Sequence, residues 1–224
     1  MITFYTALGN LEVERRNGRK KPVVIKDGQR CDLSLYEFCL WTLLAWNFLN
    51  CDDLRRQYQQ KRQELRLFDD APFEYVLARL EERKLVASGM AYTAADAVCE
   101  LVNRLRIRPI KVSSFSRFTA VIYLILRHGM TLRVAWRKRL PFRPDALQKR
   151  ILALAGHVVM TTPEIIKCFE AGANRMDSEE QLIDTVYQEY TYENLHNDTR
   201  FSSLKDPVTA AVTSLYLNKQ IIFE

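Results

Sequence analysis

Lys and Arg residues gather in three stretches of this chain, and the chemistry open to such clusters is the neutralisation of phosphate groups. The first cluster surrounds Asn17-Gly18, a dipeptide that predicts a tight hairpin between two strand-like runs. A basic hairpin can follow a phosphate backbone or reach into a minor groove, although a solvated turn has the same composition. The members of this cluster are Arg15, Arg16, Arg19, Lys20 and Lys21.

The cluster nearest the C-terminus, the third of the three, runs from residue 104 to residue 150, where Asp145 is the one opposing carboxylate. The second cluster lies on a predicted helix that is described below. Aromatic residues interleave with these cations, as they do in many nucleic-acid-binding surfaces. A second interpretation stays open, because the acidic stretch 177–198 could pair with this basic segment inside the fold. Its basic residues include Arg104, Arg106, Arg108, Lys111, Arg117, Arg127, Arg133, Arg137, Lys138, Arg139, Arg143, Lys149 and Arg150.

The residues that usually build catalytic or metal sites are scattered. The three histidines are far apart, the five cysteines include no CxxC pair, and the phosphate-loop, nucleophile-elbow and zinc-protease motifs do not occur. We therefore expect no enzyme activity, no metal and no cofactor. An odd number of dispersed cysteines is typical of reduced thiols, which predicts a cytoplasmic protein.

Bulk composition sets the broad class. The 224 residues allow one large domain or two small ones, and an apolar content of 48% is enough for buried cores. A formal net charge of +6 and a pI near 9.1 favour anionic partners, of which nucleic acid is the first to consider. The most apolar run, 118–126, is too short to cross a membrane.

The elements that must position the basic clusters follow from periodicity and from helix caps. Residues 1–30 read as β structure, and Ser34 followed by Glu37 forms a capping box that opens a first helix, apolar nearly all round. A second helix starts near Asn50, with Leu54, Tyr58 and Leu65 facing inward. Its outer face carries the second basic cluster, Arg55, Arg56, Gln59, Gln60, Lys61 and Arg62.

The stretch 70–93 predicts a third helix followed by a small hairpin. Asp70 can cap this helix, Pro72 suits its first turn, and four apolar residues recur at helical spacing. Leu85-Val86-Ala87 reads as a strand, Ser88-Gly89 as a turn and Met90-Ala91-Tyr92 as the returning strand. Thr93 then caps a fourth helix. The four apolar residues are Phe73, Val76, Leu77 and Leu80.

The last third of the chain is predicted to repeat this order. The segment PFEYVLARLEERKLV compares with PVTAAVTSLYLNKQIIF: both have a proline at the helix start, a Lys-containing break and a β-prone run. Helices are expected from Asp145, from Thr162-Pro163, from Asp177 or Ser178 and from Asp206-Pro207, with a final strand over 219–223. The connecting residues 106–144 are predicted to hold a helix from Ser116 to His128.

The segment LEERKLV…YT followed by a helix resembles winged-helix bacterial transcription regulators, well over residues 34–105 and more weakly over 145–224. In that family the third helix and the wing contact DNA, which here would be 70–83 and 85–93. The resemblance thus implies base contacts from Tyr75, Arg79 and Arg83, beside Glu74 and Ala78, with Arg55 and Arg56 near the backbone. Acidic residues on this helix and an uncharged wing tip depart from the family pattern and favour protein docking as the alternative.

We therefore predict a mainly α protein with small β hairpins and tandem winged-helix-like domains: 1–105 with the N-terminal hairpin, a basic helical connector 106–144, and a degenerate second domain 145–224. The predicted function is DNA binding in transcriptional regulation. Double-stranded DNA and a second copy of the chain are the expected partners, with no membrane; dimerisation is expected from the apolar run 118–126 and the Trp41/Trp46 helix. The alternatives are a protein-interaction scaffold and a small-ligand sensor.

Overall fold

The first half of the chain builds two small sheets and four helices. The computed structural model describes residues 1–16, 19–67, 71–110, 142–188 and 190–224. The elements of this half are β1 (Ile2–Ala7), β2 (Asn10–Arg16), β3 (Arg19–Lys26), β4 (Gln29–Asp32), α1 (Leu35–Leu44), β5 (Leu49–Asn50), α2 (Cys51–Glu64), α3 (Phe73–Glu82), β6 (Val86–Ala91) and α4 (Ala94–Arg104).

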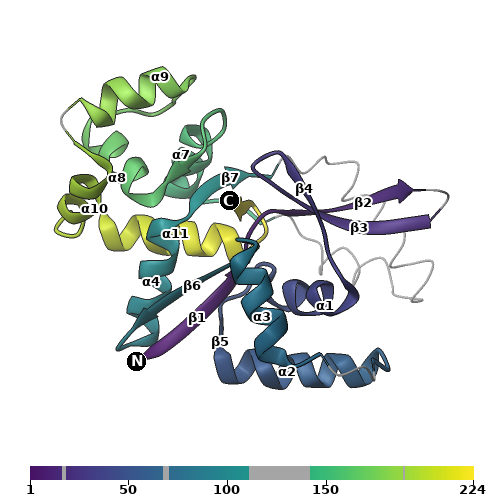
Figure 1. The fold of residues 1–224 in the computed structure, drawn as a ribbon. Coiled ribbons are helices and arrows are strands. Elements are labelled where there is room, and N and C mark those ends of the chain that lie inside the picture. The colour runs from purple at the N-terminus through teal and green to yellow at the C-terminus, as the bar shows by residue number, and fades with distance from the viewer. Residues whose placement is uncertain (17–18, 68–70, 111–141, 189) are drawn as a thin grey trace.

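The second half adds a third sheet and further helices, which lie beside the first half in Figure 1. Its elements are β7 (Arg106–Pro109), α7 (Ala146–Leu154), β8 (Met160–Thr161), α8 (Thr162–Glu170), α9 (Glu179–Leu182), a π-helical turn (Ile183–Tyr187), α10 (Tyr192–Thr199), α11 (Lys205–Leu217) and β9 (Ile221–Phe223).

The two halves share one order of elements and one sheet topology. Each contains a strand, a helix, a two-residue strand, two more helices and a last strand: β1, α1, β5, α2, α3, β6 in the first and β7, α7, β8, α8, α11, β9 in the second. In each antiparallel sheet the first strand is central, in the orders β5-β1-β6 and β8-β7-β9. The first half inserts β2–β4 after β1, and the second inserts α9 and α10 before α11.

The turns from α3 to β6 and from α11 to β9 match in detail. Lys84 and Lys219 both adopt positive φ, at 53° and 58°, directly after the helix. Lys84 N–H donates to the Glu81 carbonyl and Leu85 N–H to the Leu80 carbonyl; Lys219 and Gln220 make the same two bonds, to Tyr216 and Leu215. Both helices therefore end in a Schellman-type turn with lysine in the left-handed position. The two segments compared in the sequence occupy equivalent places.

The hairpin predicted over 85–93 is wrong. Val86–Ala91 is one continuous strand, and it pairs along its length with β1, from Ile2 opposite Ala91 to Ala7 opposite Val86. Gly89 is not a turn residue: a Cβ there would lie 2.6 Å from the Ala97 carbonyl oxygen and 2.7 Å from the Leu101 Cβ. Glycine at this position lets α4 approach the sheet, which is a tertiary requirement that a turn propensity does not reveal.

Helix α4 lies between the two halves. One side packs on β1 and β6, while the other contacts α8 and α11, and its buried Leu101 and Val102 belong to the core of the second half. The core of the first half centres on Leu40, Trp41 and Leu44 of α1, with the apolar face of α3 against them. The four apolar residues predicted to face inward from α3 are all buried.

Helix caps largely follow the sequence. The capping boxes of α1 (Ser34–Glu37) and α7 (Asp145–Gln148) form, and Asn50 and Thr93 cap α2 and α4. Two details differ. Leu65 follows α2 and is 46% exposed instead of facing inward, and the helix expected from Ser178 shortens to α9 and the π-helical turn.

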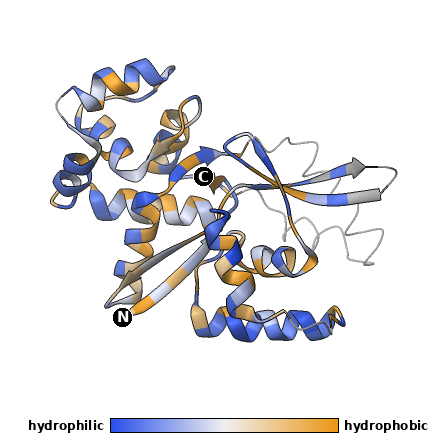
Figure 2. Cartoon of the chain, in the orientation of Figure 1, coloured by the Kyte–Doolittle hydropathy of each residue, from blue (hydrophilic) through white to orange (hydrophobic). Residues whose placement is uncertain are grey.

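The fold class is mixed α/β, because three three-stranded sheets accompany the helices within the described ranges; "mainly α" understates them. Residues 106–109, which the sequence assigned to the connector, form the central strand β7 of the last sheet. Asp70 and the helix expected over 116–128 lie outside the described residues. Figure 2 shows the hydrophilic character of α2 at the edge of the molecule.

Candidate nucleic-acid interface

The β2–β3 arm carries the first basic cluster. Antiparallel pairing runs from Asn10 opposite Ile25 to Arg16 opposite Arg19, so the strands are joined by the two residues 17–18, as the Asn-Gly signal predicts. The arm extends from the body of the molecule in Figure 1. The second turn of this sheet, Asp27-Gly28, has positive φ at both positions, as a two-residue hairpin turn of type I′ requires.

Residues of like charge face each other at the end of this arm. The register places Arg15 opposite Lys20 and Arg16 opposite Arg19. The backbone register therefore gathers four basic residues at the end of the arm. Nearer the body, Glu14 bonds Arg30 at 3.1 Å, and Lys21 bonds Asp32 at 2.6 Å, so positive charge is offset there.

The basic face of α2 is engaged in exposed ion pairs. Arg55 Nη2 lies 2.7 Å from Glu74 Oε1 on α3, and its guanidinium stacks 5.4 Å from the Phe73 ring centre. Arg56, whose side chain is 77% exposed, pairs with Asp53 one turn earlier. Exposed pairs contribute at most about 1 kcal/mol, so both arginines can exchange their carboxylate for a phosphate at small cost.

Arg79 and Arg83 of the predicted reading helix converge on one buried carboxylate. Glu37 Oε1 is 2.7 Å from Arg83 Nη1 and 3.5 Å from Arg79 Nε, and the Glu37 side chain is 3% exposed. Arg83 Nη2 also donates to the Asp32 carbonyl oxygen at 2.7 Å. Arg83 therefore ties α3 to the start of α1. The sequence identified Glu37 as a capping residue and missed this second role, since the partner lies 46 residues away.

Burial alone would raise the pKa of the Glu37 carboxyl, but hydrogen bonds from the Ser34 backbone and from Arg83 hold that pKa below its ordinary value. The carboxylate is thus charged at neutral pH and holds both arginines. Tyr75, by contrast, is 58% exposed on the outer face of α3, with Arg79 stacked 5.8 Å from its ring centre. Tyr75 and Arg79 are the predicted base-contacting residues that remain on the surface.

Arg137, Lys138 and Arg139 lie outside the described residues. Their segment dominates the charge of the chain nonetheless: residues 111–141 contain seven Lys or Arg and no Asp or Glu, while the formal net charge of the whole is +6. The rest of the chain is therefore close to neutral, and an electrostatic attraction to nucleic acid depends on where the cations are placed.

The hydroxyl residues of α11 line a groove against α4. Thr209, Thr213 and Ser214 face Ala95, Val98 and Cys99 across a groove of about 670 Å³, with Phe4 also in its lining. Thr209 Oγ1 donates to Asn103 Oδ1 of α4 at 3.3 Å. Asp206 is the charged member of this lining among the residues that the structure describes, so the helix equivalent to α3 presents no cation here.

The two tryptophans from which dimerisation was predicted make contacts within the chain. Trp41 is 1% exposed, and Trp46 Nε1 donates to the Ile221 carbonyl oxygen of β9 at 3.3 Å. The apolar run 118–126 lies outside the described residues. Within the described ranges, no helix has the length and apolar content needed to span a membrane.

Comparisons of this chain with protein-family models, with curated proteins and with solved structures find no match.

Proposed function

We propose that this protein binds double-stranded DNA through a pair of rearranged winged-helix units, of which the first carries the basic arm. A winged helix is a helical unit whose third helix is followed by a two-stranded wing. Here one strand follows each third helix, β6 after α3 and β9 after α11, and the second strand is supplied from earlier in the chain by β1 and β7. The repeated order of elements and the matched Lys84 and Lys219 turns support this assignment.

The observation that carries DNA binding is the like-charge register at the end of the β2–β3 arm. Arg15 opposite Lys20 and Arg16 opposite Arg19 bring four basic residues to one end of a two-stranded arm, and such a concentration of positive charge favours a polyanion as partner. A projecting strand pair of this kind fits a groove of the duplex or follows its backbone. The exposed Arg55 and Arg56 of α2 supply further phosphate contacts in the proposal.

Helix α3 has fewer side chains available for base contacts than the sequence predicted. Arg83 is committed to Glu37, and Glu74 is drawn to Arg55, so the outer face of α3 offers Tyr75 and Arg79 with the carboxylates of Glu81 and Glu82 nearby. We therefore assign most of the affinity to phosphate contacts, which are independent of sequence.

Fluorescence anisotropy with a random-sequence duplex, repeated across a salt series, tests the proposal. The wild-type protein should bind at low salt and weaken steeply as salt rises. The double variant R16A/R19A should lower the salt slope by about 2, because each lost phosphate contact removes about 0.9. The matched control R175A/K219A also removes two exposed positive charges, outside the three basic clusters, and should keep the wild-type slope. A folded, monodisperse wild-type protein that fails to bind at low salt would refute DNA binding.

Protein docking is the second candidate, and the α4–α11 groove favours it. Its lining is mostly apolar or hydroxylic, with Val98, Leu217 and Phe4 among the larger side chains, which suits a peptide or a small apolar ligand better than a phosphate backbone. The substitution Ala210→Trp would fill this groove. If Ala210→Trp abolishes binding of a partner protein or peptide and leaves DNA affinity unchanged, the groove is a docking site.

A further inference from the structure

Strand β6 is the last strand of its sheet, and one of its edges is open. Among the described residues the sheet order is β5-β1-β6, so β6 pairs with β1 on one side only. Leu8 N–H donates to the Leu85 carbonyl oxygen at 2.9 Å, which continues the β1–β6 register by one pair and fixes the alternation of its hydrogen bonds. Every second residue of β6 therefore turns its backbone N–H and C=O groups away from β1. These residues are Val86, Ser88 and Met90.

The equivalent edge in the second half of the chain is covered. The bonds that β9 exchanges with β7 leave Ile221 and Phe223 pointing outward. Both of their carbonyl oxygens accept hydrogen bonds from the first half, at 3.3 Å from Trp46 Nε1 and at 2.7 Å from Gly9 N–H. The outward backbone groups of β6 receive no such bond from any residue that the structure describes. The first half thus covers the edge of the second, while its own equivalent edge is available.

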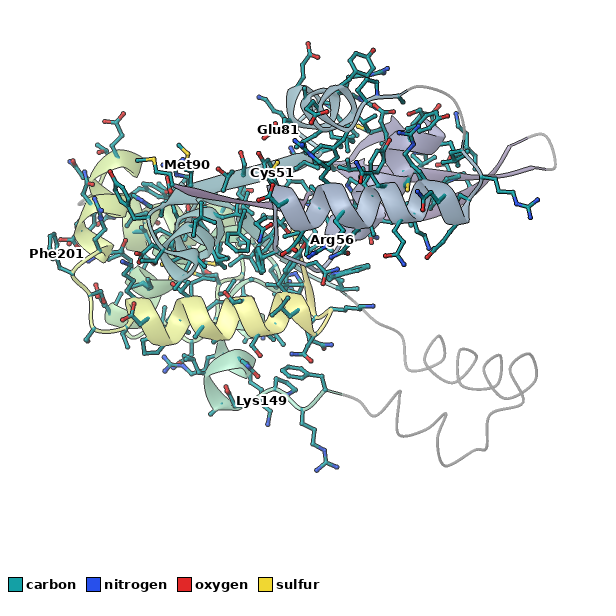
Figure 3. The ribbon with its side chains drawn as sticks, turned by 90° about the horizontal axis from the view of Figure 1, so that it is seen from below. Cys51, Arg56, Glu81, Met90, Lys149 and Phe201 are labelled. Atoms are coloured by element: carbon teal, nitrogen blue, oxygen red, sulfur yellow. The ribbon has the colours of Figure 1, made fainter. Side chains whose placement is uncertain are left out.

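The sequence of β6 lacks the devices that usually protect an edge strand. Its six residues, VASGMA, include no charged residue and no proline, and the strand pairs with β1 along its whole length without a bulge. Exposed apolar side chains lie around its C-terminal end: Met90 is 54% exposed, Tyr92 81% and Ile2 of the neighbouring strand 40%. Figure 3 shows Met90 at the outer surface of the molecule. An open, uncharged edge of this kind is a template for a further strand.

We propose that β6 pairs antiparallel with β6 of a second copy of this chain, so that the two sheets join across a twofold axis at Ser88. In this register Ser88 lies opposite Ser88 of the second copy, and Val86 lies opposite Met90. Outward residues therefore face outward residues, and each of the three pairs exchanges two backbone hydrogen bonds. Every outward N–H and C=O group of β6 finds a partner in this arrangement.

The side chains around the edge favour a second copy over other occupants. Because β6 carries no charge, pairing it with itself sets no like charges opposite each other. The register places the exposed Met90 side chain across from Val86, and it brings the exposed Lys84 toward the ring of Tyr92 for a cation–π contact. A twofold axis also closes the assembly at two copies, so the edge of β6 is used up in both.

This contact is independent of the proposed DNA binding. The sequence predicted a dimer from the run 118–126 and from the Trp41/Trp46 helix, whereas this interface lies on β6. Ser88-Gly89 was predicted to be a turn, and a turn has no edge to offer. The pairing of β6 with β1, which only the tertiary structure shows, is what creates the open edge.

Sedimentation equilibrium of the full chain without DNA tests the proposal. Wild type should sediment as a dimer, at twice the 26.2 kDa of one chain. S88K should raise the dissociation constant of the dimer by about tenfold or more, because it sets two ammonium groups opposite each other at the axis. The Ser88 side chain is exposed, so circular dichroism should show that S88K folds as wild type does. The control S203K adds the same charge at an exposed serine outside β6 and should dimerise like wild type.

A charge-swap experiment tests the register itself. S88E alone should also dimerise weakly, and an equal mixture of S88K and S88E should recover the dimer, because lysine then faces glutamate across the axis. A monomeric wild-type protein, a dimer that S88K does not weaken, or a mixture that stays monomeric would each overturn the proposal. A protein that dimerises in this way and binds no duplex would refute the proposed function alone.

Discussion

The Tyr216 hydroxyl of α11 lies 2.7 Å from the Thr6 hydroxyl of β1, so one buried hydrogen bond joins residues 210 positions apart. The same oxygen accepts from the Trp46 backbone N–H at 3.0 Å. The Tyr216 ring packs at a tilt against the rings of Phe48 and Phe223, with ring centres 5.2 and 4.3 Å away. Gly9 N–H donates to the Phe223 carbonyl oxygen at 2.7 Å beside it. The two halves of the chain are therefore coupled through a polar contact inside an aromatic cluster.

Tyr216→Phe should lower the free energy of unfolding by about 1–3 kcal/mol, because it strips a buried partner from Trp46 N–H and Thr6. Urea denaturation measures this change. Tyr92→Phe, at an 81% exposed position, is the matched control and should unfold like wild type. Burial raises the pKa of Tyr216 to about 12, so its effect should not vary with pH between 5 and 9. Equal stability of the two variants would show that the hydroxyl does not couple the halves.

Glu37→Gln should destabilise the protein by about 2 kcal/mol at pH 7, because the buried charge that Arg83 and Arg79 share is lost. The pKa of Glu37 is lower in the folded protein than in the unfolded chain, so its contribution is complete above about pH 4.5 and disappears as the pH falls through the folded-state value.

Unfolding by urea at pH 7 and again near pH 3 checks both parts of the Glu37 prediction. The difference between Glu37→Gln and wild type should shrink at the lower pH. Glu64→Gln is the control, since its pair with Lys61 is exposed on α2. A gap between variant and wild type that stays constant with pH would contradict the role of the charge.

Gly89→Ala should cost about 1–3 kcal/mol of stability, because the added methyl group would collide with the backbone of α4 at Ala97 and Leu101. Thermal unfolding measures the loss. Ser88→Ala, at the exposed neighbouring position of the same strand, should change stability little. If Gly89 were instead the tip of a wing, alanine there would be tolerated or would act through turn geometry alone.

The triple variant R137A/K138A/R139A should reduce duplex affinity and lower the salt slope by about 3, since residues 111–141 hold a concentrated share of the positive charge. The measurement is the same anisotropy salt series as for the arm. An unchanged slope would remove this segment from the interface, and affinity would then depend on the arm and on Arg55 and Arg56 of α2.

Local patterns in the sequence were sufficient wherever the stabilising contacts are local. Ser34 and Glu37 form the predicted capping box, α7 begins after Asp145 as expected, and the apolar spacing of α3 places its buried face. These interactions join residues three or four positions apart. The hairpin joined at Asn17-Gly18 follows for the same reason. The repeat was also visible, since both third helices end in a similar Lys-containing break.

Only the tertiary structure decided how the strands pair and what the charged residues do. β1 pairs with β6, and β7 with β9, across about 85 and 115 residues of sequence. The sequence of β6 resembles a hairpin as long as its pairing with β1 is unknown. Arg83 looks like a base-reading residue until Glu37 reaches it from another helix. Strand pairing and ion pairing depend on which surfaces the collapsed chain brings together, and the identity of a residue does not specify its partner.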